Sequence, residues 1–372
     1  MTAVTRPDWS GRLARLQAGL ADAALEAQVI SAPRNIRYLT GFDGTAGLLV
    51  IAPRAAVLLV DGRYSALARE RQAQGVLAPD VEAVEVSGPY DTALVALLGA
   101  RGWRRVGFES QHVTVAGLAR WERAAPDVYW GPVEDAVERL RLVKDAFEVA
   151  VFRRAGEQLA GVARALGSLV AAGRTEREVA RAIDAALERA GFQAVAFPTI
   201  VASGPHSALP HARPTERRLG PGDLVVLDFG GVLDGYCVDL TRMAAVGEPS
   251  PPLRAAFEAV REAQAAALAA VRPGIEASAV DTAARDRLAA HGLGEAFLHA
   301  TGHGLGLEVH EAPRLGRATD HGSERLAEGM VFTVEPGAYL EGLGGARLED
   351  DVLVLADGCA VLTDAPRDLL IV

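Results

Sequence analysis

The sequence predicts two domains, an α/β domain over residues 1–132 followed by an α+β domain over residues 133–372. The chain has 372 residues, which is too long for one ordinary domain of roughly 100–200 residues and suits two. Helix-like and strand-like segments alternate as far as Trp130-Gly131-Pro132, which has the character of a break. Beyond it, the order helix, helix, strands occurs twice, which indicates a duplicated α+β unit around one antiparallel sheet.

The elements of the first domain follow from the spacing of apolar residues. Residues 9–27 carry leucines at helical intervals, and residues 47–51 and 55–60 are short apolar runs joined by Ala52-Pro53-Arg54, which predicts a hairpin. Further helices are expected over 64–74 and 91–101, and a strand over 105–109. A charged helix over 133–142 is expected to connect the two domains.

The second domain is expected to begin with helices over 144–172 and 175–190, followed by a strand over 199–203. Residues 224–246 have the pattern of a long hairpin. Two more helices are predicted over 253–271 and 277–291, separated by Pro273-Gly274, and strands over 330–340 and 346–355 complete the repeat.

Composition excludes several classes of protein. A net charge of −10 argues against nucleic-acid binding, and no apolar run approaches the ~18 residues of a membrane helix. Two cysteines cannot form a disulfide framework, and the N-terminus lacks the apolar region of a signal peptide, so we expect a soluble, cytoplasmic protein. All basic residues but Lys144 are arginines; with so much alanine this indicates a biased genome, and no arginine is singled out for its type.

Two carboxylates lie within apolar strands of the predicted hairpin. Asp228 ends the run Leu224-Val225-Val226-Leu227, and Asp239 occupies the next strand. A turn at Leu233-Asp234 would pair the two directly, and a turn at Asp234-Gly235 would make them diagonal neighbours. Either register puts both on one face with Cβ atoms within ~5–8 Å. Two buried carboxylates repel each other unless cations hold them, so a metal site is predicted.

Other segments of the same half supply further ligands. Seven of the eight histidines lie between His206 and His321, and His303 stands among glycines that let the backbone approach closely. Glu335 ends an apolar strand, and a tight loop through 341–345 would bring it opposite Glu349. Four carboxylates and one imidazole form an oxygen-rich set that suits two divalent ions of the Mn or Co type, with Zn possible, and does not suit a structural zinc.

These five residues, in this order and with this flanking sequence, resemble the dinuclear metallopeptidases of the pita-bread fold, in particular the prolidase and aminopeptidase P branch. The resemblance covers Lys144 to the C-terminus closely and reaches the N-terminal domain more weakly. The stretches that carry it are 203–211, 239–242 and 302–311, with weaker support from 35–41 and 61–64.

The resemblance implies hydrolysis of the Xaa-Pro peptide bond by a hydroxide that bridges two metal ions, Mn most often. It implies a homodimer in which each N-terminal domain caps the partner's active site. The implied metal ligands are Asp228, Asp239, His303, Glu335 and Glu349. Glu335 also matches a proton shuttle, and the implied substrate-binding residues are His211, His299, His310, Arg314 and Arg347. Of these, His211 and His310 match the histidines that hold the scissile carbonyl.

Several alternatives stay open or are weighed against the residues. Metal-free creatinase-like enzymes and non-catalytic peptide-binding modules lack the ligands, and all five are present here. An Xaa-Pro dipeptidase is favoured over an Xaa-Pro aminopeptidase because Arg314 resembles an arginine that faces the substrate carboxylate; Arg213 and Arg37 are less specific candidates. His206 stands where the family more often has Asn, so it either adds an imidazole near the site or lines its loop.

Overall fold

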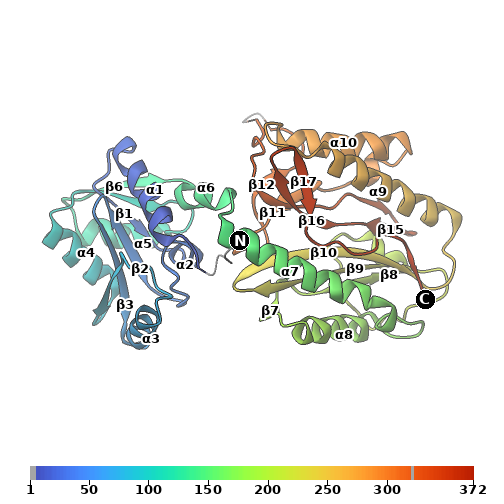
Figure 1. Cartoon of the computed structure of the whole chain (residues 1–372), viewed down its shortest axis with the longest axis horizontal. Coiled ribbons are helices and arrows are strands. Elements are labelled where there is room, and N and C mark those ends of the chain that lie inside the picture. The colour runs from blue at the N-terminus through green and yellow to red at the C-terminus, as the bar shows by residue number, and fades with distance from the viewer. Residues whose placement is uncertain (1–5, 320–321) are drawn as a thin grey trace. The chain divides into compact units, whose positions relative to one another are not determined.

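The computed structural model describes residues 6–319 and 322–372. Contacts divide the chain into two compact units, one ending at Arg141 and the other starting at Leu142 (Figure 1). The division lies beyond residue 132 because the helix after it belongs to the first unit. In that unit, Arg141 donates to the Asn35 side chain (2.7 Å), and Tyr38 donates to the carbonyl of Leu140 (2.9 Å).

The first unit is a six-stranded mixed sheet in the order β4-β3-β2-β1-β5-β6, with helices around it (Figure 1). Its central strands are buried at every position, because side chains on both faces of the sheet are covered. The elements are α1 (Trp9–Asp22), β1 (Ala27–Ile30), α2 (Pro33–Thr40), β2 (Leu48–Ala52), β3 (Ala55–Asp61), α3 (Gly62–Ala73), β4 (Glu82–Val86), α4 (Tyr90–Arg101), β5 (Arg105–Glu109), α5 (Val115–Ala124), β6 (Tyr129–Val133) and α6 (Ala136–Leu142).

The predicted hairpin of β2 and β3 is confirmed, and two details of the prediction are wrong. The first helix ends at Asp22, five residues before the predicted end at Ala27, where the strand β1 begins. Residues 130–132 are not a break but lie in β6, which pairs with β5 in parallel. Pro132 is compatible with a strand there because β6 is at the edge of the sheet.

The second unit repeats a helix pair followed by strands, as predicted. In the first repeat, capping boxes at Asp145 and Thr175 fix the helix starts. The elements are α7 (Ala146–Arg164), η1 (Leu166–Ser168), α8 (Glu176–Arg189), β7 (Ala194–Val195), β8 (Ile200–Ser203), η2 (Gly204–Ala208), β9 (Leu224–Leu233), β10 (Tyr236–Ala245), α9 (Pro251–Ala270), α10 (Ala277–Ala290), η3 (Gly294–Ala296), β11 (Gly302–Gly304), β12 (Glu311–Leu315), β13 (Val331–Val334), β14 (Gly337–Leu340), β15 (Gly344–Arg347), β16 (Asp350–Leu355), β17 (Gly358–Val361) and β18 (Leu370–Ile371).

These strands form two five-stranded sheets and a two-stranded hairpin, where the sequence predicted one sheet. One sheet contains β18-β10-β9-β7 with β8, and the other has the order β12-β11-β13-β16-β17. Where β10 lies beside β16, the Asp351 carboxylate accepts a hydrogen bond from the Asp239 backbone N–H (3.0 Å). A side chain therefore replaces a regular ladder bond, and the two sheets meet at a seam.

Among the described residues, no helix is long and apolar enough to cross a membrane.

Candidate metal centre and active site

The β9–β10 hairpin brings the two aspartates together at the seam. Asp234 and Gly235 form its turn with positive φ values of 49° and 84°, the combination that two-residue hairpin turns favour. Asp228 therefore lies opposite Thr241, one diagonal step from Asp239, which is the second of the two predicted registers. Both aspartates are buried.

A second antiparallel pairing brings Glu335 opposite Glu349, as predicted. Val334 pairs with Asp350 and Gly337 pairs with Arg347, so the two glutamates occupy matching positions between these pairs. Pro336 has no N–H for a ladder bond, and the pairing is interrupted at this point. Glu349 is buried and accepts a hydrogen bond from the Thr241 hydroxyl (2.6 Å).

His303 lies on β11, which pairs with β13. Its Nε2 atom is 3.4 Å from Oε1 of Glu335 and 4.0 Å from Oδ2 of Asp239. The neighbouring glycines are required by close backbone approach, because a Cβ on Gly302 would lie 1.9 Å from the carbonyl oxygen of Thr333. Potential ligand atoms of Asp239, His303 and Glu349 all lie within 4.8 Å of one another.

The electrostatics of this cluster fit divalent cations. Burial, followed by repulsion from neighbouring carboxylates, raises the pKa values of Asp239 and Glu349 well above their ordinary range. One oxygen each of Asp228 and Asp239 is buried and has no hydrogen-bond partner among the described residues. Burial also lowers the pKa of His303, which favours the neutral, ligating form of the imidazole. Unpartnered oxygens, crowded negative charge and a neutral imidazole are the donor set of a divalent metal centre.

A chain of hydrogen bonds leads from the carboxylates to His299. Arg347 donates to Asp228 (2.6 Å) and to the hydroxyl of Tyr339 (2.9 Å), and that hydroxyl lies 2.8 Å from Nε2 of His299. Burial lowers the pKa of His299, so a neutral imidazole is favoured here too. Arg347, predicted to bind substrate, thus contacts a carboxylate of the cluster and the carbonyl of Pro210 (3.2 Å).

Sequence reasoning missed Tyr339, Thr241 and Asp351. Strand alternation could have found Thr241, since it stands two residues after Asp239 and faces the same side. Tyr339 follows the interruption at Pro336, where alternation no longer predicts a face. Asp351 follows Glu349 and Asp350 in the sequence, and nothing in this run indicates that Asp351 accepts a hydrogen bond from the backbone N–H of Asp239.

The predicted substrate-binding histidines fall into two environments. The ring of His310 is 4.2 Å from that of His303, and burial lowers the pKa of His310. His211 is exposed, and its positive charge would further lower the pKa values of His299 and His310. His206 contacts a carboxylate outside the cluster, with its Nδ1 atom 3.2 Å from Oε1 of Glu176.

Arg314 lies on β12, directly opposite His303 in the pairing of β11 with β12. Residues opposite each other in an antiparallel pair face the same side, and Arg314 is exposed. Its guanidinium is therefore on the face of the sheet that carries the imidazole of the cluster. His321 lies outside the described residues.

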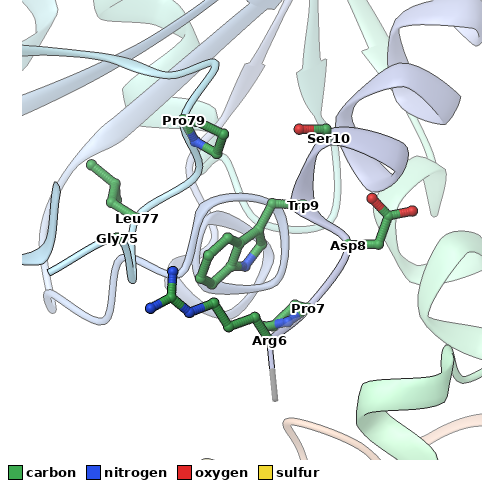
Figure 2. A pocket seen from close by; sticks show the side chains of 8 residues that line it. All are labelled: Arg6, Pro7, Asp8, Trp9, Ser10, Gly75, Leu77 and Pro79. Carbon is green, nitrogen blue, oxygen red and sulfur yellow. The ribbon is translucent and has the colours of Figure 1, made fainter. Parts of the chain in front are cut away.

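A separate open pocket of about 300 Å³ lies in the first unit (Figure 2). Its polar groups already serve the local fold: Asp8 accepts a hydrogen bond from the Gly11 N–H (2.9 Å) at the start of α1, and Ser10 donates to Asp80. The pocket is lined by Arg6, Pro7, Asp8, Trp9, Ser10, Gly75, Leu77 and Pro79.

Comparison with known proteins agrees with this geometry. The chain matches the model of metallopeptidase family M24 over residues 150–356 and that of the creatinase/prolidase N-terminal domain over residues 12–143. It belongs to metallopeptidase family M24. The matches to these two family models confirm the predicted resemblance, the fold class and the assignment as a metallopeptidase.

Three relatives illustrate the likeness. An Xaa-Pro dipeptidase of Pyrococcus horikoshii is 33% identical over 348 residues, 93% of this chain and 95% of the relative. The structure of an Xaa-Pro dipeptidase from Bacillus anthracis matches with a TM-score of 0.93 at 33% identity, covering 98% of this chain and 100% of that one. An X-Pro aminopeptidase from Thermotoga maritima matches with a TM-score of 0.85 at 34% identity, covering 94% and 98%.

Proposed function

We propose that this metallopeptidase is an Xaa-Pro dipeptidase that uses two divalent metal ions. The observation that carries the proposal is the cluster of four carboxylates and one imidazole at the seam. Within residues 6–319 and 322–372, two of its buried oxygens have no hydrogen-bond partner. The relatives named Xaa-Pro dipeptidase support the substrate class. A creatinase-like enzyme or a non-catalytic module binds no metal here, so the repulsion among these buried carboxylates would not be offset.

The ions would be held by Asp228, Asp239, His303, Glu335 and Glu349. We propose Mn as the metal, with Co or Zn as alternatives, because oxygen ligands predominate and one imidazole is present. Such ions supply an activated water at neutral pH and offset the negative charge of the carboxylates.

The remaining steps belong to the side chains. His310 and His211 donate hydrogen bonds to the oxygen of the scissile carbonyl as negative charge develops on it. Glu335 carries a proton to the proline nitrogen, which must be protonated to leave as an amine. His299, held by Tyr339, lines the pocket, and Arg347 fixes both Asp228 and the backbone before His211.

Substrate length separates the proposal from its alternative. Arg314 would pair with the free carboxylate of the terminal proline, whereas an aminopeptidase leaves that side open for a longer chain. The likeness to the Thermotoga maritima X-Pro aminopeptidase supports the alternative, an Xaa-Pro aminopeptidase.

The deciding experiment compares an Xaa-Pro dipeptide with the same dipeptide extended by one residue. We expect the dipeptide to be cleaved much faster, activity to vanish on exhaustive chelation, and Mn to restore it. Equal cleavage of both peptides would make the protein an aminopeptidase, and full activity in verified metal-free protein would remove the two-metal mechanism.

We further propose a cytoplasmic homodimer in which the N-terminal domain, predicted over residues 1–132, caps the partner's active site. The same arrangement is implied by the resemblance on which the substrate proposal draws. Sedimentation of the purified protein should give twice the chain mass of 39.0 kDa, and a monomer with full activity would contradict it.

A further inference from the structure

Glu176 is a fully buried carboxylate that lies outside the metal centre. It is the first residue of α8 and is 0% exposed. Its Oε1 atom accepts hydrogen bonds from the backbone N–H (2.9 Å) and hydroxyl (2.7 Å) of Ser203, and Oε2 accepts from the N–H (2.9 Å) and hydroxyl (2.7 Å) of Thr215. One side chain therefore joins two points of the chain that flank His211.

Further contacts make this junction tight. Nδ1 of His206 lies 3.2 and 3.3 Å from the two carboxylate oxygens, and the Glu176 backbone N–H donates to the carbonyl of Arg217 (3.0 Å). Burial opposes the charge of Glu176, but the donors from Thr215 and Ser203 outweigh it and lower its pKa. The start of α8 adds the favourable end of the helix dipole. Glu176 is thus a charged group whose oxygens are fully used within the chain.

The segment 203–215 is also held from the side of the metal centre. Arg347, which donates to Asp228, donates to the carbonyl of Pro210 (3.2 Å), the residue before His211. The Gly345 N–H donates to the hydroxyl of Ser207 (2.8 Å). Glu176 therefore holds the segment at its two ends, and Arg347 holds it near its centre, at the carbonyl of Pro210, which directly precedes His211.

We propose that Glu176 is a positioning residue for His211. By fixing both ends of segment 203–215, it keeps the His211 imidazole beside the cluster where the substrate carbonyl is to bind. The inference rests on the proposed function only for the role of His211.

The other half of the duplicated unit contains a matching contact. Oδ1 of Asp281, on the second helix of that half, accepts from the backbone N–H (3.0 Å) and the hydroxyl (2.9 Å) of Thr301. Thr301 stands two residues before His303, and Ser203 stands eight residues before His211. In both halves, a buried carboxylate on the second helix holds the residue that leads to a histidine of the site.

The experiment replaces Glu176 by Gln and uses Glu178→Gln as the matched control. Glu178 lies in the same helical turn, and its carboxylate accepts from the Thr175 N–H (2.7 Å). In Glu176→Gln, the amide group would face donors of Ser203 or Thr215. A misplacement of about 1 Å can cost on the order of 100-fold in rate. We expect kcat on an Xaa-Pro dipeptide to fall roughly 10–100-fold, with KM and bound metal nearly unchanged, while Glu178→Gln keeps the rate of wild type.

A double substitution separates positioning from general damage. If Glu176 acts through His211, Glu176→Gln should lower kcat little further in a His211→Ala background. The same fold-loss in both backgrounds would overturn the proposal. If Glu176→Gln does not fold, Thr215→Val removes a single donor and should give a smaller loss with the same dependence on His211.

Hydrogen exchange in the metal-free protein tests the inference without any activity. The amides of Ser203 and Thr215 should exchange faster in Glu176→Gln and at the wild-type rate in Glu178→Gln. Unchanged exchange in Glu176→Gln would overturn the proposal, even if the dipeptidase function is correct. A wild-type protein without Xaa-Pro activity would remove the proposed function and leave the exchange result to decide on Glu176 alone.

Discussion

The second unit buries carboxylates in two different ways. In the cluster at the seam, one oxygen of Asp239 has no hydrogen-bond partner in the described part of the chain, and burial together with nearby carboxylates raises the pKa of Asp239. Glu176 is buried just as deeply, yet each of its oxygens accepts several hydrogen bonds and its pKa is lowered. A buried charge is stable where the chain supplies donors and costly where it does not. The contrast supports the proposal that the cluster at the seam binds cations.

The largest effect should come from removing a carboxylate of the metal centre. Glu349→Ala should lose bound metal and abolish activity, because too little negative charge remains to hold the ions. Metal analysis of the purified variant, with Glu157→Ala as a control at an exposed carboxylate, measures this directly. If Glu349→Ala retains two ions per chain at full occupancy, the ligand assignment is wrong.

The same contrast explains what the sequence could predict. Asp228 and Asp239 stood out because each interrupts an apolar run, and alternation alone put them on one face. Their relative register was left open between two turns, although Asp-Gly is the pair that two-residue hairpin turns prefer; the structure places the turn at Asp234 and Gly235. The contacts of Glu176 had no signal, because its donors are scattered over segments that meet only in the fold.

The elements near the site that escaped prediction are short. β11 and β12 have three and five residues, too few for a period, although they bring His303 and Arg314 together. The division into two sheets was also missed, because it depends on how β10 and β16 meet, and these strands are far apart in sequence. The roles of the histidines came from the resemblance and not from the pattern of the strands.

The next effect concerns the two histidines proposed to hold the scissile carbonyl. His211→Ala and His310→Ala should keep both ions and lose on the order of 10²–10³ in kcat, as loss of one donor to a developing oxyanion typically does. Steady-state kinetics and metal analysis on the same preparations check both parts.

The exposed His291, which contacts Glu262, is the matched control for these substitutions. His291→Ala should behave as wild type. Depletion of metal in His310→Ala would instead place His310 among the ligands. The test is informative because the ring of His310 contacts that of His303.

Arg314→Ala should act on substrate length and leave metal content unchanged. A charge-assisted contact contributes about 1.5–3 kcal/mol, so KM for an Xaa-Pro dipeptide should rise roughly ten- to 150-fold. Discrimination against the extended peptide should fall at the same time, because that peptide has an amide in place of the charge. Arg325→Ala, at an exposed arginine near Glu276, controls for loss of a surface charge. An unchanged preference for dipeptides would exclude Arg314 as the carboxylate-binding residue.

The smallest effect tests the contrast itself through thermal stability. Asp239→Asn removes one repelling charge, so the metal-free variant should melt at or above the temperature of wild type, and Mn should stabilise it less. Glu176→Gln should melt lower with or without metal, because unmatched buried donors cost about 1–3 kcal/mol. Since the pKa of Glu176 is lowered from its ordinary 4.5, its contribution is present above that pH and is lost as the pH falls below it. The melting temperatures of wild type and Glu176→Gln should therefore converge in acid. A metal-free Asp239→Asn variant that melts well below wild type would show that the carboxylates of the cluster do not repel one another.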